Sequence, residues 1–411
     1  MASGPNEETI VRKQRSETER QVAELLRTAR ESLGLSLAFM TRMDGTTQHL
    51  EVVESPLPWV FRDGNTQPQA TTFCQAIMDG KLPAVMPNVK NFPAAMKLPS
   101  ARMPRIRSFV SVPMVLSDGT VYGTFCAAGF AADKELSKRD KALMEVLSHA
   151  ASVIIEPGVR ERRRNAEIEN RLRPVIDGGG PLVLLQPIVD LATRRRVGTE
   201  ALSRFPQEWK MAPDVCFADA DLIGERERLE VLALRRAGEH LDRVSGYVAM
   251  NVSPQTLFTD DCADFLARMP LDRVLLELSE HEPIEDYDAL KAVLAPLRAR
   301  GMRLAIDDVG AGFSSLRHIV ITAPDVIKLD RSIVTGLSAD PVLAVVVHSL
   351  VDLARATGAQ VVAEGVETEA DAATLAELGA DLGQGWHFGR ATTPEDLRDD
   401  YPVAAPAAAL G

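Results

Sequence analysis

Acidic and amide side chains lie at the ends of successive apolar segments in the second half of the chain. Each segment is typical of a buried strand, and the residues at these ends are Glu200, Asn251, Glu277, Glu280, Asp307, Asp308, Lys328, Asp330, Glu364 and Gln384. Clustered carboxylates repel one another unless a cation neutralises them. Oxygen ligands without histidine or cysteine favour Mg²⁺ or Mn²⁺ over zinc or copper. Adjacent Asp307 and Asp308 suit a pair of ions, an arrangement that activates water and cleaves phosphate esters.

Positive charge accompanies these acids. Lys328 and Arg204 could bind a phosphate group, and arginine is suited to a two-pronged grip. Each residue alone also has a purely structural explanation: Glu200 could pair with Arg204, Lys328 with Asp330, and residues 307–308 could form a turn. None of these explains polar residues at the ends of so many segments, so a shared site is the better hypothesis.

The segments alternate with amphipathic helical stretches, a pattern that predicts a parallel sheet surrounded by helices. Eight strand candidates within roughly 230 residues predict a closed barrel, in which side chains at the strand ends meet in one place. The candidates are residues 182–190, 197–204, 247–251, 274–280, 304–308, 326–330, 360–364 and 381–388. The fold therefore predicts the acid cluster, and the acid cluster supports the fold.

The first two of these strands are too close in sequence for a parallel connection. Only residues 191–196 join them, whereas a parallel crossover needs a dozen residues or more. We therefore expect a modified (β/α)8 TIM-type barrel whose first strand runs antiparallel to the second.

This region resembles the EAL family of cyclic di-GMP phosphodiesterases. The motifs that carry the resemblance occur in family order from about Leu182 to Pro394. They are L-Q-P-I-V-D-L (185–191), T-E-A-L-S-R-F (199–205), N-V-S-P (251–254), L-E-L-S-E (276–280), D-D-V-G-A-G-F-S-S-L (307–316), I-K-L-D (327–330), A-E-G-V-E (363–367) and Q-G-W-H-F-G-R (384–390). The resemblance implies hydrolysis of cyclic di-GMP to linear pGpG.

The resemblance also implies a role for each motif residue. Two ions, Mg²⁺ or Mn²⁺, would be held in each barrel by Glu200, Asn251, Glu277, Asp307, Asp308 and Glu364. The implied catalytic residues are Lys328, Glu364, Glu280 and Gln384. Of these, Lys328 would orient or deprotonate the attacking water, Glu280 would anchor the loop that starts at Asp308, and Gln384 would support the water. The substrate would contact Gln186, Leu202, Arg204, Asp330 and Glu367.

Two positions depart from the family pattern. Val309 replaces the usual phenylalanine in the loop that couples dimerisation to metal binding, and Ala391 replaces a common proline. Neither change removes an implied metal ligand, although the smaller Val309 side chain could weaken that coupling. The chain contains no G-G-D-E-F signature, which argues against synthesis of the dinucleotide.

The N-terminal region predicts a separate α+β domain over residues 12–155. A helix at 12–32, strands including 109–116 and 121–129 joined by an Asp118-Gly119 turn, and a closing helix at 136–155 support it. Residues 109–126 and the motif T-F-C-Q-A-I-M-D-G (72–80) resemble the GAF family of small-molecule sensors, whose ligand the sequence leaves unknown. Cys74 and Cys126 could be neighbours, and simple packing is the favoured interpretation of both. His149 is interpreted as a packing residue, and no Cys-His pair indicates a bilin.

A connector occupies residues 156–180 between the two predicted domains. Pro157-Gly158 is expected to break the preceding helix, after which Ile168, Leu172 and Val175 fall near one face of a new helix. A signalling coiled coil and a solvated spacer both remain open, and residues 178–180 predict a glycine hinge. The barrel is then assigned to residues 181–400 and a disordered tail to residues 401–411.

The composition of the chain limits the kinds of binding partner that we expect. The chain has 411 residues, 45% apolar and 25% charged, with a formal net charge of -12. The acidic balance argues against duplex nucleic acid and membrane surfaces. Cys74, Cys126, Cys216 and Cys262 show no C-x-x-C spacing, and no signal peptide or run of about 18 apolar residues occurs. We therefore expect a cytoplasmic protein, and the family resemblance adds a homodimer.

Three hypotheses follow. The first is a regulated phosphodiesterase whose rate the N-terminal domain sets through dimer geometry. The second is a catalytically idle barrel that binds cyclic di-GMP and signals to a partner; idle relatives commonly lack a metal-holding residue, and none is missing here. The third, a scaffold that needs neither ligand nor metal, leaves the polar strand ends without a purpose.

Overall fold

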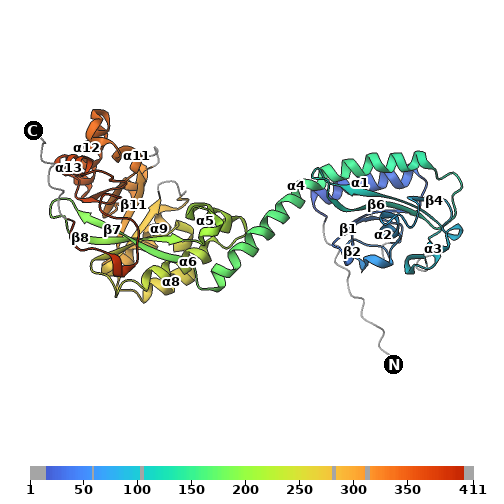
Figure 1. Ribbon diagram of the computed structural model, residues 1–411, viewed down its shortest axis with the longest axis horizontal. Helices are drawn as coiled ribbons and strands as arrows, with labels where there is room; N and C mark the ends of the chain where they lie inside the picture. Colours follow the sequence, from blue (N-terminus) through green and yellow to red (C-terminus); the bar gives the residue numbers. More distant parts are fainter. Residues whose placement is uncertain (1–14, 58–59, 102–105, 280–283, 311–314, 402–411) are drawn as a thin grey trace, which may run out of the picture. The chain divides into compact units, whose positions relative to one another are not determined.

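The computed structural model describes residues 15–57, 60–101, 106–279, 284–310 and 315–401 (Figure 1). The chain divides into two compact units, Met1–Arg164 and Asn165–Gly411. Glu280 and the predicted tail beyond residue 401 lie outside the described residues.

The first unit is built on a six-stranded antiparallel sheet, in the order β3-β2-β1-β6-β5-β4. The predicted hairpin is confirmed: β5 and β6 are joined by a turn with Gly119 at φ 81° and the Asp118 carboxylate accepting the Thr120 N–H at 2.9 Å. The strands are β1 Leu37–Met43, β2 Thr47–Glu54, β3 Thr66–Pro68, β4 Val85–Met86, β5 Ser108–Val115 and β6 Val121–Gly129.

Helices cover both faces of this sheet and create two apolar cores. Helices α1 and α4 lie along one face, where Leu26 and Met144 pack with Phe125 (Figure 1). On the other face, Phe73 and Ala95 from two short helices pack with Phe109. The helices are α1 Glu17–Ser32, α2 Phe73–Met78, α3 Pro93–Met96 and α4 Lys138–Asp177. The expected α+β domain is confirmed.

Helix α4 is continuous over 40 residues, so the predicted break at Pro157-Gly158 is wrong. Pro157 is exposed, and the carbonyl that loses its N–H partner belongs to Val153, whose side chain is 59% exposed. Water can therefore satisfy that carbonyl. Burial on both sides of the proline holds the helix together, because Ile155 belongs to the core of the first unit and Leu172 to a core of the second.

The same helix is, among the described residues, the one that by length and hydropathy could cross a membrane. Its most apolar 18-residue window has a mean hydropathy of 1.3, and 33% of that window is buried. Met144, Ala151 and Ile155 of this helix belong to the apolar core of the first unit. Since a core helix meets the same criteria, the window is weak evidence for a membrane span.

The second unit is a closed eight-stranded barrel in the order β10-β11-β12-β13-β14-β7-β8-β9. β7 is antiparallel to both of its neighbours, and every other pair is parallel, as the short 191–196 connection predicts. The strands are β7 Leu182–Asp190, β8 Arg196–Arg204, β9 Tyr247–Asn251, β10 Val274–Ser279, β11 Arg303–Val309, β12 Val326–Leu329, β13 Gln360–Ala363 and β14 Leu382–Gly383.

Helices surround the barrel and bury its outer face, while a smaller cluster that includes Ile188, Leu275 and Val362 fills its interior. The helices are α5 Pro213–Leu222, α6 Arg226–Gly238, α7 Pro254–Leu257, α8 Asp260–Ala267, α9 Tyr287–Ala299, α10 Ser315–Thr322, α11 Arg331–Val334, α12 Pro341–Thr357 and α13 Glu369–Leu378.

The last strand is much shorter than the 381–388 that the sequence predicts. After Gly383 the backbone leaves the sheet: His387 N–H donates to the Val366 carbonyl, and Phe388 N–H donates to the Gly385 carbonyl at 3.1 Å. A Cβ on Gly385 would lie 2.2 Å from the Val366 oxygen. The close approach of two loops therefore replaces strand pairing here.

Replacement of Pro157 by alanine tests the account of α4. The change restores a backbone N–H and removes a ring from a helix interior, so we expect stabilisation by about 1–3 kcal/mol. The thermal unfolding midpoint of the full chain is the measurement. Glu161→Ala, at another exposed site of α4, is the control and should change the midpoint little. A lower midpoint in Pro157→Ala would contradict the account.

Candidate active site

Strand register brings the predicted acids to one end of the barrel. Glu277 of β10 is aligned with Asn251 of β9, and Ser279 of β10 with Asp307 of β11. Glu200 of β8 is aligned with Gln186 of β7. Because aligned neighbours point to the same side of a sheet, these side chains meet at the barrel end.

Lys328 lies at the centre of this group. Its Nζ is 2.6 Å from Glu364 Oε1, 2.8 Å from Glu277 Oε2, 3.2 Å from Asp307 Oδ1 and 3.6 Å from Glu200 Oε1. The side chain is fully buried. Burial lowers the pKa of an ammonium, but the four surrounding carboxylates outweigh it and raise the pKa of Lys328 well above its usual range. The suggestion of a surface pair with Asp330 is therefore wrong.

Burial has the opposite effect on the acids. It raises the pKa of Glu277 well above its usual value, that of Asp307 to about 6 and that of Glu364 to about 8, each against the lowering effect of Lys328. Glu200 differs. Burial raises its pKa, but the charge of Lys328 and hydrogen bonds from Gln384 and Asn251 together lower it. One lysine does not neutralise this cluster.

Amide side chains fix the position of Glu200. Asn251 Nδ2 donates to Glu200 Oε1 at 3.0 Å, and Gln384 Nε2 donates to Glu200 Oε2. Gln384 Nε2 also lies 3.2 Å from Gln186 Oε1, while Gln186 Nε2 donates to the Gly389 carbonyl at 3.1 Å. Two sequence-distant amides thus hold the Glu200 carboxylate, and Gln186 supports one of them, Gln384.

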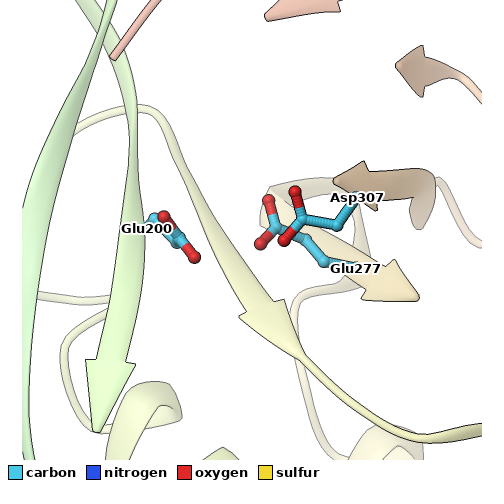
Figure 2. A group of neighbouring side chains, drawn as sticks. All are labelled: Glu200, Glu277 and Asp307. Carbon is cyan, nitrogen blue, oxygen red and sulfur yellow. The ribbon is translucent and has the colours of Figure 1, made fainter. Parts of the chain in front are cut away.

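The carboxylates form two overlapping groups that could each hold a metal ion. Glu200, Glu277 and Asp307 offer oxygens within 4.8 Å of one another, and so do Asp307, Asp308 and Glu364. Figure 2 shows the Glu200 carboxylate facing those of Glu277 and Asp307. Glu277 Oε1 is buried without a hydrogen-bond partner among the described atoms. A buried, unpartnered oxygen in a ring of hard ligands fits a divalent cation.

Asp307 belongs to both groups. This agrees with the expectation from sequence that the adjacent residues Asp307 and Asp308 suit a pair of metal ions. Asp308 has a left-handed backbone with φ 61°, a conformation that costs free energy in a residue other than glycine. Its N–H donates to Asp307 Oδ1 at 2.9 Å. This irregularity within β11 lets two consecutive acids face one site.

Val309 is the last residue of β11 and is fully buried. The sequence places it in the following loop, and that placement is wrong. It pairs with Leu329 of β12 after an irregularity in register, so its backbone extends the sheet by one residue.

A cavity of ≈ 260 Å³ adjoins the acids. It is lined by Gln186, Glu200, Leu202, Arg331, Thr335, Glu364, Gly365, Glu367, Gln384, Gly385 and Trp386. The structure therefore brings Gln186, Leu202 and Glu367 of the expected substrate contacts to one cavity. It does not bring Asp330 or Arg204 there. Asp330 caps α11 by accepting the Ser332 N–H at 2.9 Å, and Arg204 binds the Ser203 carbonyl.

Arg331, Thr335 and Trp386 line the cavity but were not predicted. Trp386 is 59% exposed, and the Arg390 guanidinium lies 4.1 Å from its ring centroid. Its place in the Q-G-W-H-F-G-R motif was the available signal. Arg331 immediately follows Asp330, but the sequence does not show that α11 begins there and turns the arginine toward the cavity.

Comparison with known families agrees with this geometry. Residues 169–391, more than half of the chain, match the model of the EAL domain. The chain belongs to the EAL domain family. Residues 16–156 match the GAF domain model, so a GAF domain precedes the EAL domain.

Two curated relatives illustrate the likeness. Rv1354c, an uncharacterized protein of Mycobacterium tuberculosis H37Rv, is 33% identical over 247 residues, which cover 56% of this chain and 40% of that protein. The "probable cyclic di-GMP phosphodiesterase PdeB" of Escherichia coli K12 is 29% identical over 253 residues, covering 58% of this chain and 48% of PdeB. The chain thus spans less than half the length of both relatives.

A solved structure matches the EAL domain in fold. The PaMucR phosphodiesterase in complex with c-di-GMP aligns with a TM-score of 0.50 at 28% identity, covering 56% of this chain and 100% of that one.

The raised acid pKa values predict that stabilisation by a divalent ion grows with pH. An acid whose folded pKa is raised keeps its proton after the unfolded chain has lost it, so the metal-free fold loses stability as pH rises from about 4 towards about 8. A bound ion offsets the cost of burying the charged acids. At a pH below the pKa of these acids, the ion must first displace their protons, which weakens its binding. We expect the Mn²⁺-induced rise in unfolding midpoint to be larger at pH 8 than at pH 6.

Glu364→Gln is the matched control, because it removes the group whose pKa lies at about 8. In that variant the difference between pH 6 and pH 8 should shrink. A Mn²⁺-induced rise that is equal at both pH values in the unaltered protein would contradict the prediction.

Proposed function

We propose that this protein is a phosphodiesterase that hydrolyses cyclic di-GMP to linear pGpG with two Mg²⁺ or Mn²⁺ ions. The observation that carries the proposal is the pair of carboxylate groups sharing Asp307 beside an open cavity. PdeB and the PaMucR complex support this substrate, because both names refer to cyclic di-GMP. The complete set of carboxylates favours an active enzyme over an idle receptor.

The proposed metal ligands are Glu200, Asn251, Glu277, Asp307, Asp308 and Glu364. When bound, two ions would activate the attacking water and offset the negative charge that develops on the phosphate. This chain's own groups then have separate tasks. Asn251 and Gln384 orient Glu200, and the Lys328 ammonium holds Glu277 and Glu364 in place.

Substrate would occupy the cavity beside these acids. Gln186, Leu202 and Glu367 line it, as does Arg331, a cation at the edge of an acidic site. A guanidinium is suited to a phosphodiester, and its charge helps an anionic ligand to approach an acidic site. Arg204 and Asp330 are proposed to act only if substrate binding rearranges the ends of β8 and β12.

We also propose that the GAF domain regulates the rate. One continuous helix, α4, contributes Ile155 to the GAF core and Leu172 to a core of the EAL unit. A helix shared by two cores couples them when it has two states and each core shifts the equilibrium between those states.

Glu200→Gln tests catalysis. The change keeps the size of the side chain and removes one negative ligand, so we expect at least about a 10²-fold loss of pGpG formation with Mn²⁺. Glu208→Gln, an exposed acid in the same unit, should retain full activity. Chromatographic measurement of pGpG with each metal is the assay.

The unaltered protein distinguishes the two functional hypotheses. Turnover with Mg²⁺ or Mn²⁺ supports the enzyme. Binding of cyclic di-GMP without any pGpG under both metals would contradict it and favour the receptor.

A homodimer is proposed through α12. Val342, Val345 and Val346 are 69%, 67% and 38% exposed and lie at helical spacing on one face. Val345→Glu should shift the protein from dimer to monomer in sedimentation velocity, whereas Ala373→Glu, at an exposed site on α13, should not. Equal sedimentation of both variants and the unaltered dimer would exclude this surface.

A further inference from the structure

Two thiols meet inside the GAF domain. Cys74 Sγ of α2 lies 3.4 Å from Cys126 Sγ of β6, and the two residues are only 2% and 0% exposed. Both are free thiols that come from segments 52 residues apart in sequence. The prediction that these cysteines could be neighbours is confirmed. The short distance between their sulfur atoms suggests a role beyond packing.

Polar side chains surround the two sulfurs in an otherwise apolar core. Gln48 Nε2 donates to Cys74 Sγ at 3.5 Å, while Ser111 Oγ and Thr124 Oγ1 each lie 3.2 Å from Cys126 Sγ. These three residues are at most 1% exposed, and Gln48 Oε1 has no hydrogen-bond partner among the described atoms. Buried polar groups cost free energy, so cysteines that served only as small apolar residues would not need this shell.

We propose that Cys74 and Cys126 form a reversible disulfide when the protein meets a peroxide, which makes the GAF domain a thiol-based redox sensor. The Cys74 thiolate attacks one peroxide oxygen, the O–O bond breaks, and a sulfenic acid and water result. The Cys126 sulfur then displaces water from that sulfenic acid. Two thiols and one hydrogen peroxide give one disulfide and two waters, and a low-molecular-weight thiol reverses the reaction.

The two sulfurs differ in the way that this order requires. The hydrogen bond from Cys126, opposed by burial, lowers the pKa of Cys74, whereas burial raises the pKa of Cys126. Because Cys74 lies in a short helix and Cys126 in the central strand β6, local opening exposes Cys74 first; its thiolate is then oxidised and Cys126 resolves it. Cys74 is the second residue of a six-residue helix, and local opening of so short a helix admits a small oxidant.

The disulfide would tie α2 to the centre of the sheet. β6 lies between β1 and β5, and the bond would close a loop over 52 residues. Such a cross-link restricts the unfolded chain and raises the unfolding midpoint. The oxidised GAF domain is therefore expected to be more resistant to heat than the reduced one.

The experiment uses the full-length chain, treated with hydrogen peroxide or with dithiothreitol and then alkylated in urea. We expect the peroxide sample to carry two fewer alkylated cysteines than the reduced sample. Peptide mapping should give one cross-linked pair, Cys74 with Cys126, that dithiothreitol releases. The unfolding midpoint should rise by several degrees on oxidation and return on reduction.

Variants separate this pair from the remaining thiols. Cys126→Ala should leave a Cys74 sulfenic acid that dimedone traps, with no rise in midpoint on oxidation. A chain with both Cys216→Ala and Cys262→Ala should behave as the unaltered protein does. Four alkylated cysteines after peroxide, a different pairing, or direct over-oxidation of Cys74 while Cys126 is present would overturn the proposal.

Discussion

Lys328 Nζ lies within 3.6 Å of four carboxylates, at a place where its side chain has no contact with solvent. One ammonium cannot balance Glu200, Glu277, Asp307 and Glu364; burial first, and then repulsion between the carboxylates, raises the pKa of three of these acids. With Asp308 included, five carboxylates, one ammonium and two divalent ions would carry no net charge together. The barrel end is therefore poised to bind cations, because every alternative leaves buried charge uncompensated or acids protonated.

The rest of the barrel holds these carboxylates close together. Parallel strands align Glu277 with Asn251, and the antiparallel pairing of β7 with β8 puts Gln186 beside Glu200. The left-handed backbone of Asp308 lets Asp307 and Asp308 face the same site, although they are consecutive in sequence. Such strain persists only where the surrounding structure fixes it, and the buried Val309 beside it does so through its pairing with Leu329.

Sequence alone was sufficient for the features that depend on local pattern. Polar residues at strand ends identified the acid cluster, and the short 191–196 connection required the antiparallel first strand. Features that depend on tertiary packing were missed. Helix α4 continues through Pro157 because Ile155 and Leu172, on either side of the proline, are buried in apolar cores. The last strand was shortened because the loop after Gly383 packs on Val366. Trp386 and Arg331 were missed because the loop after Gly383 and the start of α11, which place them at the cavity, depend on tertiary packing.

Anomalous diffraction from crystals of the full chain soaked in Mn²⁺ tests the central claim most directly. The account requires two manganese peaks about 3.5–4 Å apart, one against Glu200 and Glu277, the other against Asp308 and Glu364, with Asp307 touching both. A single peak, or peaks that lie away from Asp307 while Lys328 keeps its four carboxylates, would contradict the account.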